Sequence, residues 1–255
     1  MSNKREREKR REQRLQEETK VGAGERRTRL LQLGAGAVFL AIAAVVVLIV
    51  VNSNDNGGGD ATNLKEVSAV DSLVGGVPQN GMVLGKPGAK VELIEYGDLQ
   101  CPVCKAYSEE ILPQVIENKV DGGAAKISFH NFTIIGAQSG PAGAAALAAG
   151  AQGRGWNYLE LFYRNQGEEN SGYATDEFLT AVAKAAGVED IAKWNKERKG
   201  PKFTKEVEET TAQAERYGFT GTPSFAITGP GSNGVELLGT LTSPEEFEKA
   251  IEAAS

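Results

Sequence analysis

The two cysteines of this 255-residue chain stand close together as Cys101-Pro102-Val103-Cys104, directly after an apolar strand pattern and at the start of a predicted helix. A thiol at a helix N-terminus faces unpaired N–H groups and the positive end of the helix dipole. Both favour its thiolate and lower its pKa from about 8.5 into a range of about 3.5–7.5. We therefore predict that Cys101 is an exposed nucleophile. Cys104, one turn further along, is positioned to attack a mixed disulfide and release the product.

Three other readings of the cysteine pair compete with redox chemistry. A zinc site needs two further good ligands, yet the chain has no other cysteine and a single histidine, His130. An inert structural disulfide and a coincidence of spacing are the remaining alternatives. We expect His130 to have a packing or surface role, because it lies in a predicted strand with nothing beside it to ligate a metal. Redox chemistry is the favoured reading.

Two strands and a helix must position the cysteines. Val91–Tyr96 is predicted to be a strand, and a helix follows from Cys101 to about Asn118, with a kink at Pro113. Residues 126–132 alternate as a second strand. This order and spacing predict a right-handed βαβ unit with parallel strands. Glu95 is a carboxylate inside the first strand, and an inward orientation would raise its pKa by desolvation.

The remainder of the chain predicts a helical block and then a hairpin. Several helices and no convincing strand are expected between about residues 139 and 217. Residues 224–228 and 235–238 flank a glycine-rich turn and predict an antiparallel hairpin, followed by a last helix. We expect the aromatic residues of the block to pack a core, with a substrate groove as the alternative. These residues are Trp156, Tyr158, Phe162 and Tyr163.

Composition and charge narrow the classes of protein. With 40% hydrophobic and 24% charged residues, the chain has room for one or two domains with a core and is not wholly disordered. Two cysteines exclude a disulfide-stapled scaffold. The net charge of −6 argues against a nucleic-acid partner, which needs a basic field over the folded part. Basic residues are in excess only in residues 1–29, which hold 11 Lys or Arg and 6 Glu.

An uncharged segment of 22 residues, Leu30–Val51, predicts a transmembrane helix. Its helical length of about 33 Å is enough to cross about 30 Å of hydrocarbon. The basic residues before it predict a cytoplasmic tail over 1–29, so that the rest of the chain lies outside the cytoplasm. We expect a single-pass protein of the cell membrane, with a cleaved signal peptide as the alternative. Residues 52–80, rich in polar residues, Gly and Pro, predict a flexible linker.

Two motifs resemble those of the thioredoxin-fold DsbA-like thiol:disulfide oxidoreductases, in particular the membrane-anchored bacterial members. The first is Gly97-Asp98-Leu99-Gln100-Cys101-Pro102-Val103-Cys104-Lys105, and the second is Gly221-Thr222-Pro223-Ser224-Phe225. The resemblance implies an α/β thioredoxin fold, βαβ then ββα, over residues 81–255. It also implies an inserted helical domain at about 136–217, and the predicted transmembrane helix precedes the whole.

The resemblance also assigns roles to residues around the cysteines. It implies a cis bond between Thr222 and Pro223 beside the cysteine pair, where the two residues bind an extended substrate peptide in the manner of an added strand. It implies that Glu95 moves protons to or from Cys104. Asp98 and Gln100 also match the first motif, and we expect them to shape the loop.

The function expected from these features is that of an extracytoplasmic protein disulfide oxidoreductase. We expect a dithiol oxidase that exchanges disulfides with secreted proteins and is reoxidised by an integral-membrane partner of the DsbB or vitamin K epoxide reductase-like type. It needs no cofactor beyond the Cys101–Cys104 disulfide. The neutral Pro-Val pair, where the best-known oxidases carry histidine, leaves the direction of electron flow open. The alternatives are a reductase or isomerase of the same fold and a non-catalytic peptide-binding chaperone module.

Overall fold

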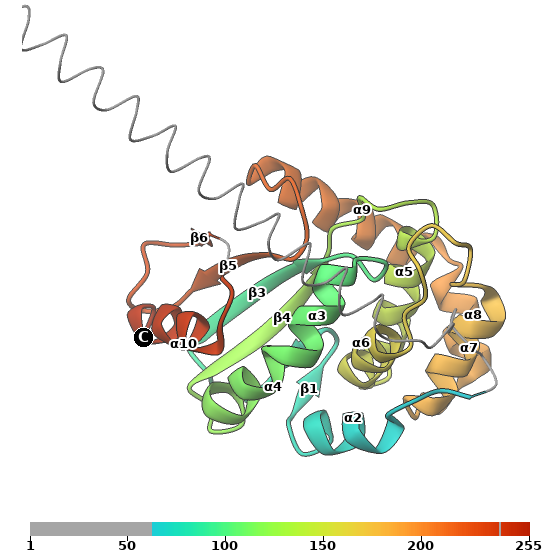
Figure 1. The fold of residues 1–255 in the computed structure, drawn as a ribbon, viewed down its shortest axis with the longest axis horizontal. Coiled ribbons are helices and arrows are strands. Elements are labelled where there is room, and N and C mark those ends of the chain that lie inside the picture. The colour runs from blue at the N-terminus through green and yellow to red at the C-terminus, as the bar shows by residue number, and fades with distance from the viewer. Residues whose placement is uncertain (1–62, 240) are drawn as a thin grey trace, which may run out of the picture. The chain divides into compact units, whose positions relative to one another are not determined.

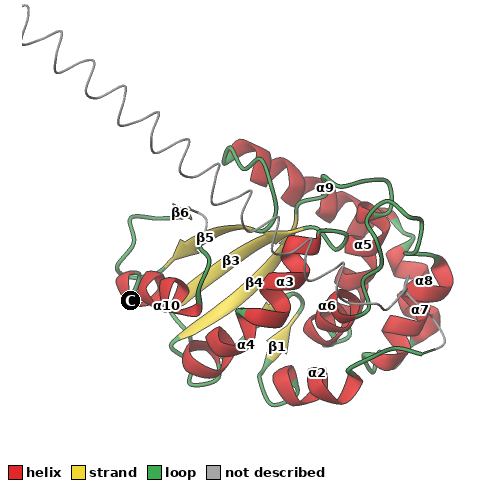
Figure 2. Cartoon of the chain, viewed as in Figure 1, coloured by secondary structure: helices red, strands yellow, loops and turns green. Residues whose placement is uncertain are grey.

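A six-stranded mixed sheet with the order β1-β2-β4-β3-β5-β6 forms the centre of the domain (Figures 1 and 2). The computed structural model describes residues 63–239 and 241–255. Its strands are β1 (Gln79–Asn80), β2 (Val83–Leu84), β3 (Val91–Gly97), β4 (Ala125–Asn131), β5 (Ser224–Thr228) and β6 (Glu236–Leu238). β3 and β4 are parallel, and β5 is antiparallel to both β3 and β6. The predicted βαβ unit and hairpin are therefore confirmed.

Helices cover both faces of the sheet and gather at one side of it (Figure 2). Those of the first half are α2 (Val67–Val74), α3 (Pro102–Glu110), α4 (Leu112–Val115), the π-helical turn η1 (Ile116–Val120) and α5 (Ser139–Gly150). Those of the second half are α6 (Gly155–Arg164), α7 (Asp176–Ala185), α8 (Ile191–Arg198), α9 (Pro201–Arg216) and α10 (Pro244–Ala253). α5 to α9 form the predicted helical insertion between β4 and β5. The thioredoxin-type α/β fold with a helical insertion is thus confirmed.

The central strand β3 is buried on both faces, which is why its sequence is apolar with little alternation. Ile94 and Tyr96 face a small cluster that includes Ala214 of α9. On the opposite face Phe225 of β5 packs against Tyr107 of α3, with ring centroids 4.9 Å apart and ring planes tilted by 58°. Glu95 is on this second face, because cross-strand partners point the same way and Glu95 is paired with Phe225.

The helix predicted from Cys101 to about Asn118 is interrupted as expected near Pro113. α3 ends at Glu110, and Ile111 adopts φ −109° and ψ −51° before α4 begins. Proline lacks the N–H of a helical hydrogen bond, and its ring crowds the carbonyl four residues earlier. The axis therefore bends here and continues as η1 to Val120.

The segment before the sheet is more ordered than the sequence indicated. α2 and β1 lie within residues 52–80, so the flexible-linker prediction is wrong for residues 67–80. Val70 and Val74, one turn apart on α2, are fully buried in the main core. Asn157 of α6 donates a hydrogen bond to Asp71 at 3.2 Å. These tertiary contacts stabilise a short helix whose own composition favours it only weakly.

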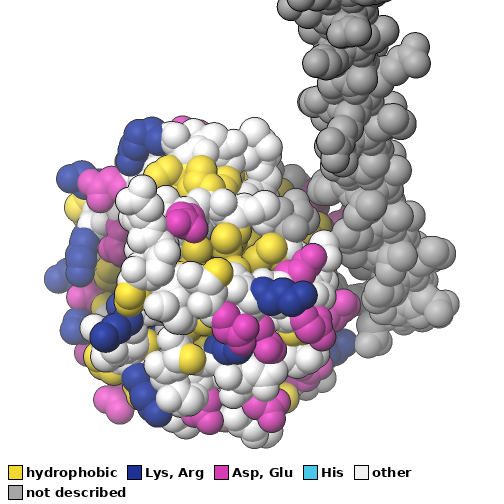
Figure 3. Space-filling view, turned by 90° about the vertical axis from the view of Figure 1, so that its left-hand side faces the viewer, with side chains coloured by type: hydrophobic (Ala, Val, Ile, Leu, Met, Phe, Trp, Pro, Cys, Tyr) yellow, Lys and Arg dark blue, Asp and Glu magenta, His cyan; other side chains and the backbone are white. Residues whose placement is uncertain are grey.

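The predicted cytoplasmic tail at 1–29 and transmembrane helix at 30–51 lie outside the described residues. Within residues 63–239 and 241–255, every helix is too short or too polar to cross a membrane. The end of the domain that carries α10 and β6 presents hydrophobic side chains among acidic and basic ones (Figure 3). Val235 and Leu237, at the edge strand β6, are 45% and 47% exposed.

Candidate active site

The cysteine pair lies where β3 gives way to α3, as the sequence predicted. Cys101 is the N-cap of α3, with an extended backbone at φ −75° and ψ 120°, and Pro102 begins the helix. The backbone N–H of Cys104 donates a hydrogen bond to Cys101 Sγ at 3.4 Å. The sulfur thus takes the place that an N-cap oxygen usually occupies, and it faces the positive end of the helix dipole.

Cys101 is much less exposed than predicted. Both cysteines are free thiols, and Cys101 is only 4% exposed, against 0% for Cys104. The prediction of an exposed nucleophile is therefore wrong as regards burial. The cover comes from the loop before β5, whose Thr222 carbonyl accepts a hydrogen bond from Cys101 Sγ at 3.3 Å. Cys101 is still the more exposed residue of the pair, and its role as the nucleophile stays a prediction.

The two thiols differ sharply in acidity. Hydrogen bonding from the Cys104 side chain is the largest cause that lowers the pKa of Cys101 to about 7, and the backbone N–H groups of Val103 and Cys104 add to it. Burial opposes this effect. Burial is also the largest cause that raises the pKa of Cys104 well above its ordinary value, followed by the hydrogen bond and charge of Cys101. Near neutral pH the thiolate of the pair is therefore carried by Cys101.

Thr222 and Pro223 lie beside the cysteines, and the peptide bond between them is cis, which confirms the prediction. Their position follows from the sheet, because β5 is antiparallel to β3 and Ser224 is paired with Tyr96. The chain that enters β5 must then run past the loop that leaves β3. Both residues are half-buried. Their predicted role in binding a substrate peptide stays a prediction.

Glu95 is buried beneath the active site, as predicted. It is 1% exposed and lies between Phe129 of β4 and Phe225 of β5 on the face covered by α3. Gly97 leaves room for it, since a Cβ at that position would lie 3.1 Å from Glu95 Oε1. Oε1 has no hydrogen-bond partner among the described residues. The carboxyl group is thus directed along β3 toward the cysteine loop.

The surroundings of Glu95 favour its protonated form. Burial is the largest cause that raises its pKa well above the ordinary value, followed by the charges of Glu160 and Cys101. The influence is mutual, since Glu95 in turn contributes to the raised pKa of Cys104. A protonated carboxyl group near a buried sulfur can supply the proton that a leaving thiolate needs. The proton-transfer role of Glu95 stays a prediction.

This arrangement has counterparts among known proteins. A family model described as Thioredoxin matches residues 78–253. The chain belongs to the thioredoxin family. A probable disulfide bond formation protein D of Bacillus cereus is 28% identical over 149 residues, which cover 57% of this chain and 69% of the relative. The disulfide bond formation protein D of Bacillus subtilis is 27% identical over 149 residues, which cover 57% of this chain and 66% of the relative.

Solved structures share the fold. Oxidised BdbD from Bacillus subtilis has a TM-score of 0.60 at 23% identity, covering 70% of this chain and 92% of its own. Wolbachia pipientis alpha-DsbA1 has a TM-score of 0.58 at 18% identity, and the match covers 68% of this chain and 89% of that protein. Together with the family match and the sequence relatives, these similarities identify this thioredoxin-family chain as a DsbA-like thiol:disulfide oxidoreductase.

Two further residues of the first motif shape the loop of this oxidoreductase, as expected. Asp98 is fully buried, and its carboxylate accepts hydrogen bonds from the backbone N–H groups of Gln100, Ile134 and Ile135 at 2.9–3.0 Å. The carboxylate therefore ties the cysteine loop to the segment after β4. Gln100 is also buried, and its Nε2 donates a hydrogen bond to Ser139 of α5 at 2.9 Å.

Other residues have the packing roles that we expected. The aromatic residues of α6 are at most 1% exposed, so the substrate-groove alternative is wrong for them; they are Trp156, Tyr158, Phe162 and Tyr163. His130 is half-buried, with Nδ1 3.3 Å from Gln213 Oε1 and its ring edge-on to Tyr96. No cluster of three or more possible metal ligands occurs in the described part of the chain.

Sequence reasoning missed Glu160, a second buried acid near the active site. It lies on α6 and is 0% exposed, and its Oε2 accepts hydrogen bonds from Ser108 at 3.0 Å and Arg164 at 2.5 Å. Burial raises its pKa to about 6 against the opposing effect of Arg164. The sequence signal that could have revealed it is the spacing of Glu160 and Arg164, an acid and a base four residues apart in an otherwise largely apolar helix. Its negative charge helps to keep Glu95 protonated.

Proposed function

We propose that this DsbA-like oxidoreductase is a dithiol oxidase that donates its disulfide to secreted proteins. A substrate thiolate attacks Cys101 Sγ, and the Cys101–Cys104 bond breaks as a mixed disulfide forms. Cys104 leaves with the electron pair and takes a proton, which Glu95 supplies. A second substrate thiolate then attacks the substrate sulfur, and Cys101 leaves as a thiolate. The substrate dithiol loses two electrons and the enzyme disulfide gains them.

One observation carries the proposed direction of electron flow. The pKa of Cys101 is lowered to about 7 by hydrogen bonds at its sulfur. A thiol of low pKa is a good leaving group, so the second attack releases Cys101 readily and passes the disulfide to the substrate. Stabilising the reduced enzyme in this way makes its disulfide more oxidising. The names of the two Bacillus relatives, which refer to disulfide bond formation, support the same direction.

Reductase or isomerase activity is the second candidate within this class. The observation that favours it is the neutral Pro102-Val103 pair, which adds no positive charge beside Cys101. Membership of the DsbA-like oxidoreductases argues against the non-catalytic peptide-binding module, which would not need either cysteine.

We expect a reduction potential between about −250 and −120 mV for the full-length protein in detergent. The measurement equilibrates the enzyme with mixtures of reduced and oxidised glutathione and counts its free thiols after acid quenching and alkylation. The neutral dipeptide should keep the value short of the oxidising limit of that range. The Cys104→Ser variant, which cannot close the disulfide, provides the baseline. A potential below about −250 mV would identify a reductase and contradict the oxidase proposal.

The proposed location is the cell membrane, with Leu30–Val51 as a single anchor and residues 1–29 in the cytoplasm. The support is the length and apolarity of the segment and the basic residues before it. An oxidising compartment outside the cytoplasm is also where substrate disulfides persist. The anchor would keep the domain near the integral-membrane reoxidant, of the DsbB or vitamin K epoxide reductase-like type, that returns Cys101 and Cys104 to the disulfide.

We expect the full-length protein to remain in the membrane pellet after alkaline carbonate extraction. Protease added outside intact protoplasts should degrade the domain over residues 63–255, while an epitope tag at the N-terminus survives. A variant that lacks residues 30–51 should instead stay in the soluble cytoplasmic fraction. Extraction of the full-length protein by carbonate, or loss of the N-terminal tag to external protease, would contradict the proposed anchor and topology.

A further inference from the structure

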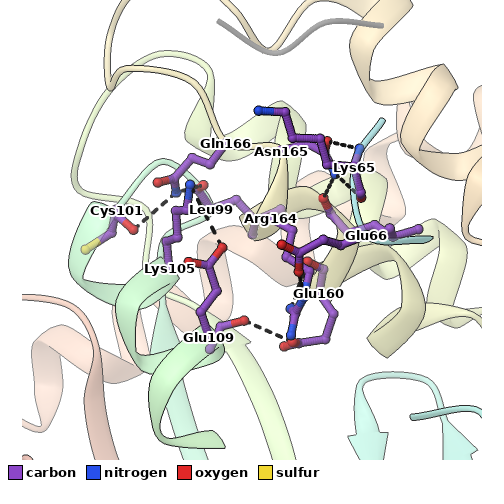
Figure 4. Close-up of polar contacts among 12 residues, drawn as sticks. Lys65, Glu66, Leu99, Cys101, Lys105, Glu109, Glu160, Arg164, Asn165 and Gln166 are labelled. Carbon is purple, nitrogen blue, oxygen red and sulfur yellow. Dashed lines mark hydrogen bonds and ion pairs between the residues drawn. The ribbon is translucent and has the colours of Figure 1, made fainter. Parts of the chain in front are cut away.

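The helical insertion reaches the active site through Gln166. This residue follows α6 and is 9% exposed, and its Nε2 donates hydrogen bonds to two backbone carbonyls of the cysteine loop. The bonds are 2.6 Å to Leu99 O and 3.1 Å to Cys101 O (Figure 4). The side-chain amide of Gln166 thus binds the backbone at Cys101 and at Leu99, two residues before it.

The loop from Asp98 to Cys101 is held at each of its four residues from this part of the insertion. Tyr163 Oη donates to Asp98 O at 3.4 Å, and Gln166 donates to Leu99 O and Cys101 O. The backbone N–H of Asn170 donates to the side chain of Gln100 at 3.2 Å. Gln166 is itself fixed by a hydrogen bond from its backbone N–H to Tyr163 O at 3.1 Å. The loop is therefore bound to the end of α6 and to the segment that follows it.

The chemistry of Cys101 makes this attachment important. Its thiolate is favoured by hydrogen bonds, chiefly from Cys104, and those bonds depend on where the sulfur sits relative to the start of α3. The carbonyl of Cys101 also accepts the first helical bond, from Lys105 N–H at 3.1 Å. Carbonyl oxygens carry partial negative charge, so a donor amide on them reduces the negative potential beside the sulfur.

Among residues 63–239 and 241–255, the titratable groups that act on Cys101 add no compensating positive charge. Cys104 comes from α3, Glu95 from β3 and Tyr163 from α6, and each of these groups is either neutral or negative. Lys105 is directed instead toward Glu109 of the same helix, at 3.9 Å. The reactivity of Cys101 is therefore sensitive to the donors and dipoles that hold its loop.

We propose that Gln166 is a positioning residue through which the helical insertion sets the reactivity of Cys101. By donating to Leu99 O and Cys101 O, it keeps Cys101 Sγ on the N-terminus of α3 and screens the sulfur from those carbonyls. This proposal rests on the oxidoreductase activity of the cysteine pair and holds for either direction of electron flow.

The decisive variant is Gln166→Glu, which replaces the donor amide with an acceptor that carries negative charge. The experiment measures the ultraviolet absorbance of the Cys101 thiolate against pH in the full-length protein. We expect the pKa of Cys101 to rise by about one unit, which at about pH 6 is a tenfold loss of thiolate. Measured at about pH 9, above the pKa of Cys101 in both proteins, the glutathione equilibrium should move about tenfold toward the enzyme disulfide, or about 30 mV.

The neighbouring residue offers a matched control. Asn165 directs its side chain away from the cysteines, donating to Lys65 O at 3.2 Å and Leu161 O at 2.8 Å (Figure 4). Asn165→Asp makes the same change of charge one residue away, and we expect it to move both measurements less than about twofold. A shift as large as that of Gln166→Glu would show a general electrostatic effect and overturn the proposal.

A second variant, Gln166→Met, keeps the side-chain length and removes the donors without adding charge. We expect it to shift the thiolate titration in the same direction as Gln166→Glu, and it replaces that variant if the latter fails to fold. If Gln166→Met lowers the free energy of unfolding but leaves the titration and the glutathione equilibrium unchanged, Gln166 has only a structural role and the proposal is wrong. The wild-type potential tests the oxidase proposal separately, because the Gln166 test uses only differences from wild type.

Discussion

Cys101→Ser is expected to reduce disulfide exchange to the uncatalysed rate, whereas Cys104→Ser is expected to accumulate a mixed disulfide with the substrate. The reason is the unequal burial and acidity of the two sulfurs. Cys101 has the only exposed surface of the pair and a pKa lowered to about 7, while Cys104 is sealed and its pKa is raised by burial. Substrate therefore joins Cys101, and only the intact pair can form the enzyme disulfide.

The measurement combines the rate of disulfide formation in a reduced unfolded protein with electrophoresis under non-reducing conditions. Treated first with glutathione disulfide, Cys104→Ser carries a Cys101–glutathione mixed disulfide, and a substrate thiolate displaces the glutathione to form a covalent enzyme–substrate adduct. These adducts should disappear on addition of reductant and be absent from Cys101→Ser and from the double variant. Adducts that form through Cys104 in the Cys101→Ser variant would contradict the assignment of the nucleophile. Full turnover by the double variant would show that the cysteine pair is not the reactive centre.

Glu95→Gln is expected to slow the step that protonates Cys104 by about tenfold or more, because an amide cannot supply the proton. The carboxyl group is 1% exposed and is held protonated by burial, by Glu160 and by Cys101. The measurement is a stopped-flow record of enzyme reduction by a dithiol substrate at several pH values. Wild type should lose rate as pH rises through the folded pKa of Glu95, and the variant should lack this dependence.

The same substitution is expected to stabilise the folded protein at neutral pH. The pKa of Glu95 is raised on folding, so the folded chain keeps a proton that the unfolded chain releases above about pH 4.3. The contribution of Glu95 to the free energy of unfolding of wild type therefore falls by about 1.4 kcal/mol for each pH unit between about 4.3 and its folded pKa. The amide of the Glu95→Gln variant does not titrate, so its stability advantage should be absent near pH 4 and grow as pH rises.

Glu92→Gln is the matched control, because Glu92 lies on the same strand. Its side chain is 26% exposed and pairs with Lys126 at 3.2 Å. We expect this variant to keep the wild-type reduction rate and the wild-type dependence of stability on pH, as measured by denaturant unfolding. If Glu95→Gln behaves in the same way as Glu92→Gln in both measurements, Glu95 neither titrates above its ordinary range nor carries the proton.

Local patterns were enough to predict the elements that hold the cysteines. The apolar run of β3, the kink at Pro113 and the hairpin of β5 and β6 depend on residues close together in sequence, and all were predicted. The Cys-x-x-Cys pair at a strand-to-helix junction pointed to redox chemistry for the same reason. Resemblance to a family added the cis bond before Pro223, which the structure confirms.

By itself, then, the sequence determined where the cysteine pair lies, the strands and helices that present it, and the helical block between β4 and β5. Only the tertiary structure decided how Cys101 is covered, because its neighbour Thr222 is 121 residues away along the chain. The contacts of Gln166 with the cysteine loop, and of α2 with the core, likewise join distant segments. Such contacts follow from how whole helices and strands pack together, which periodicity and spacing within one segment do not encode.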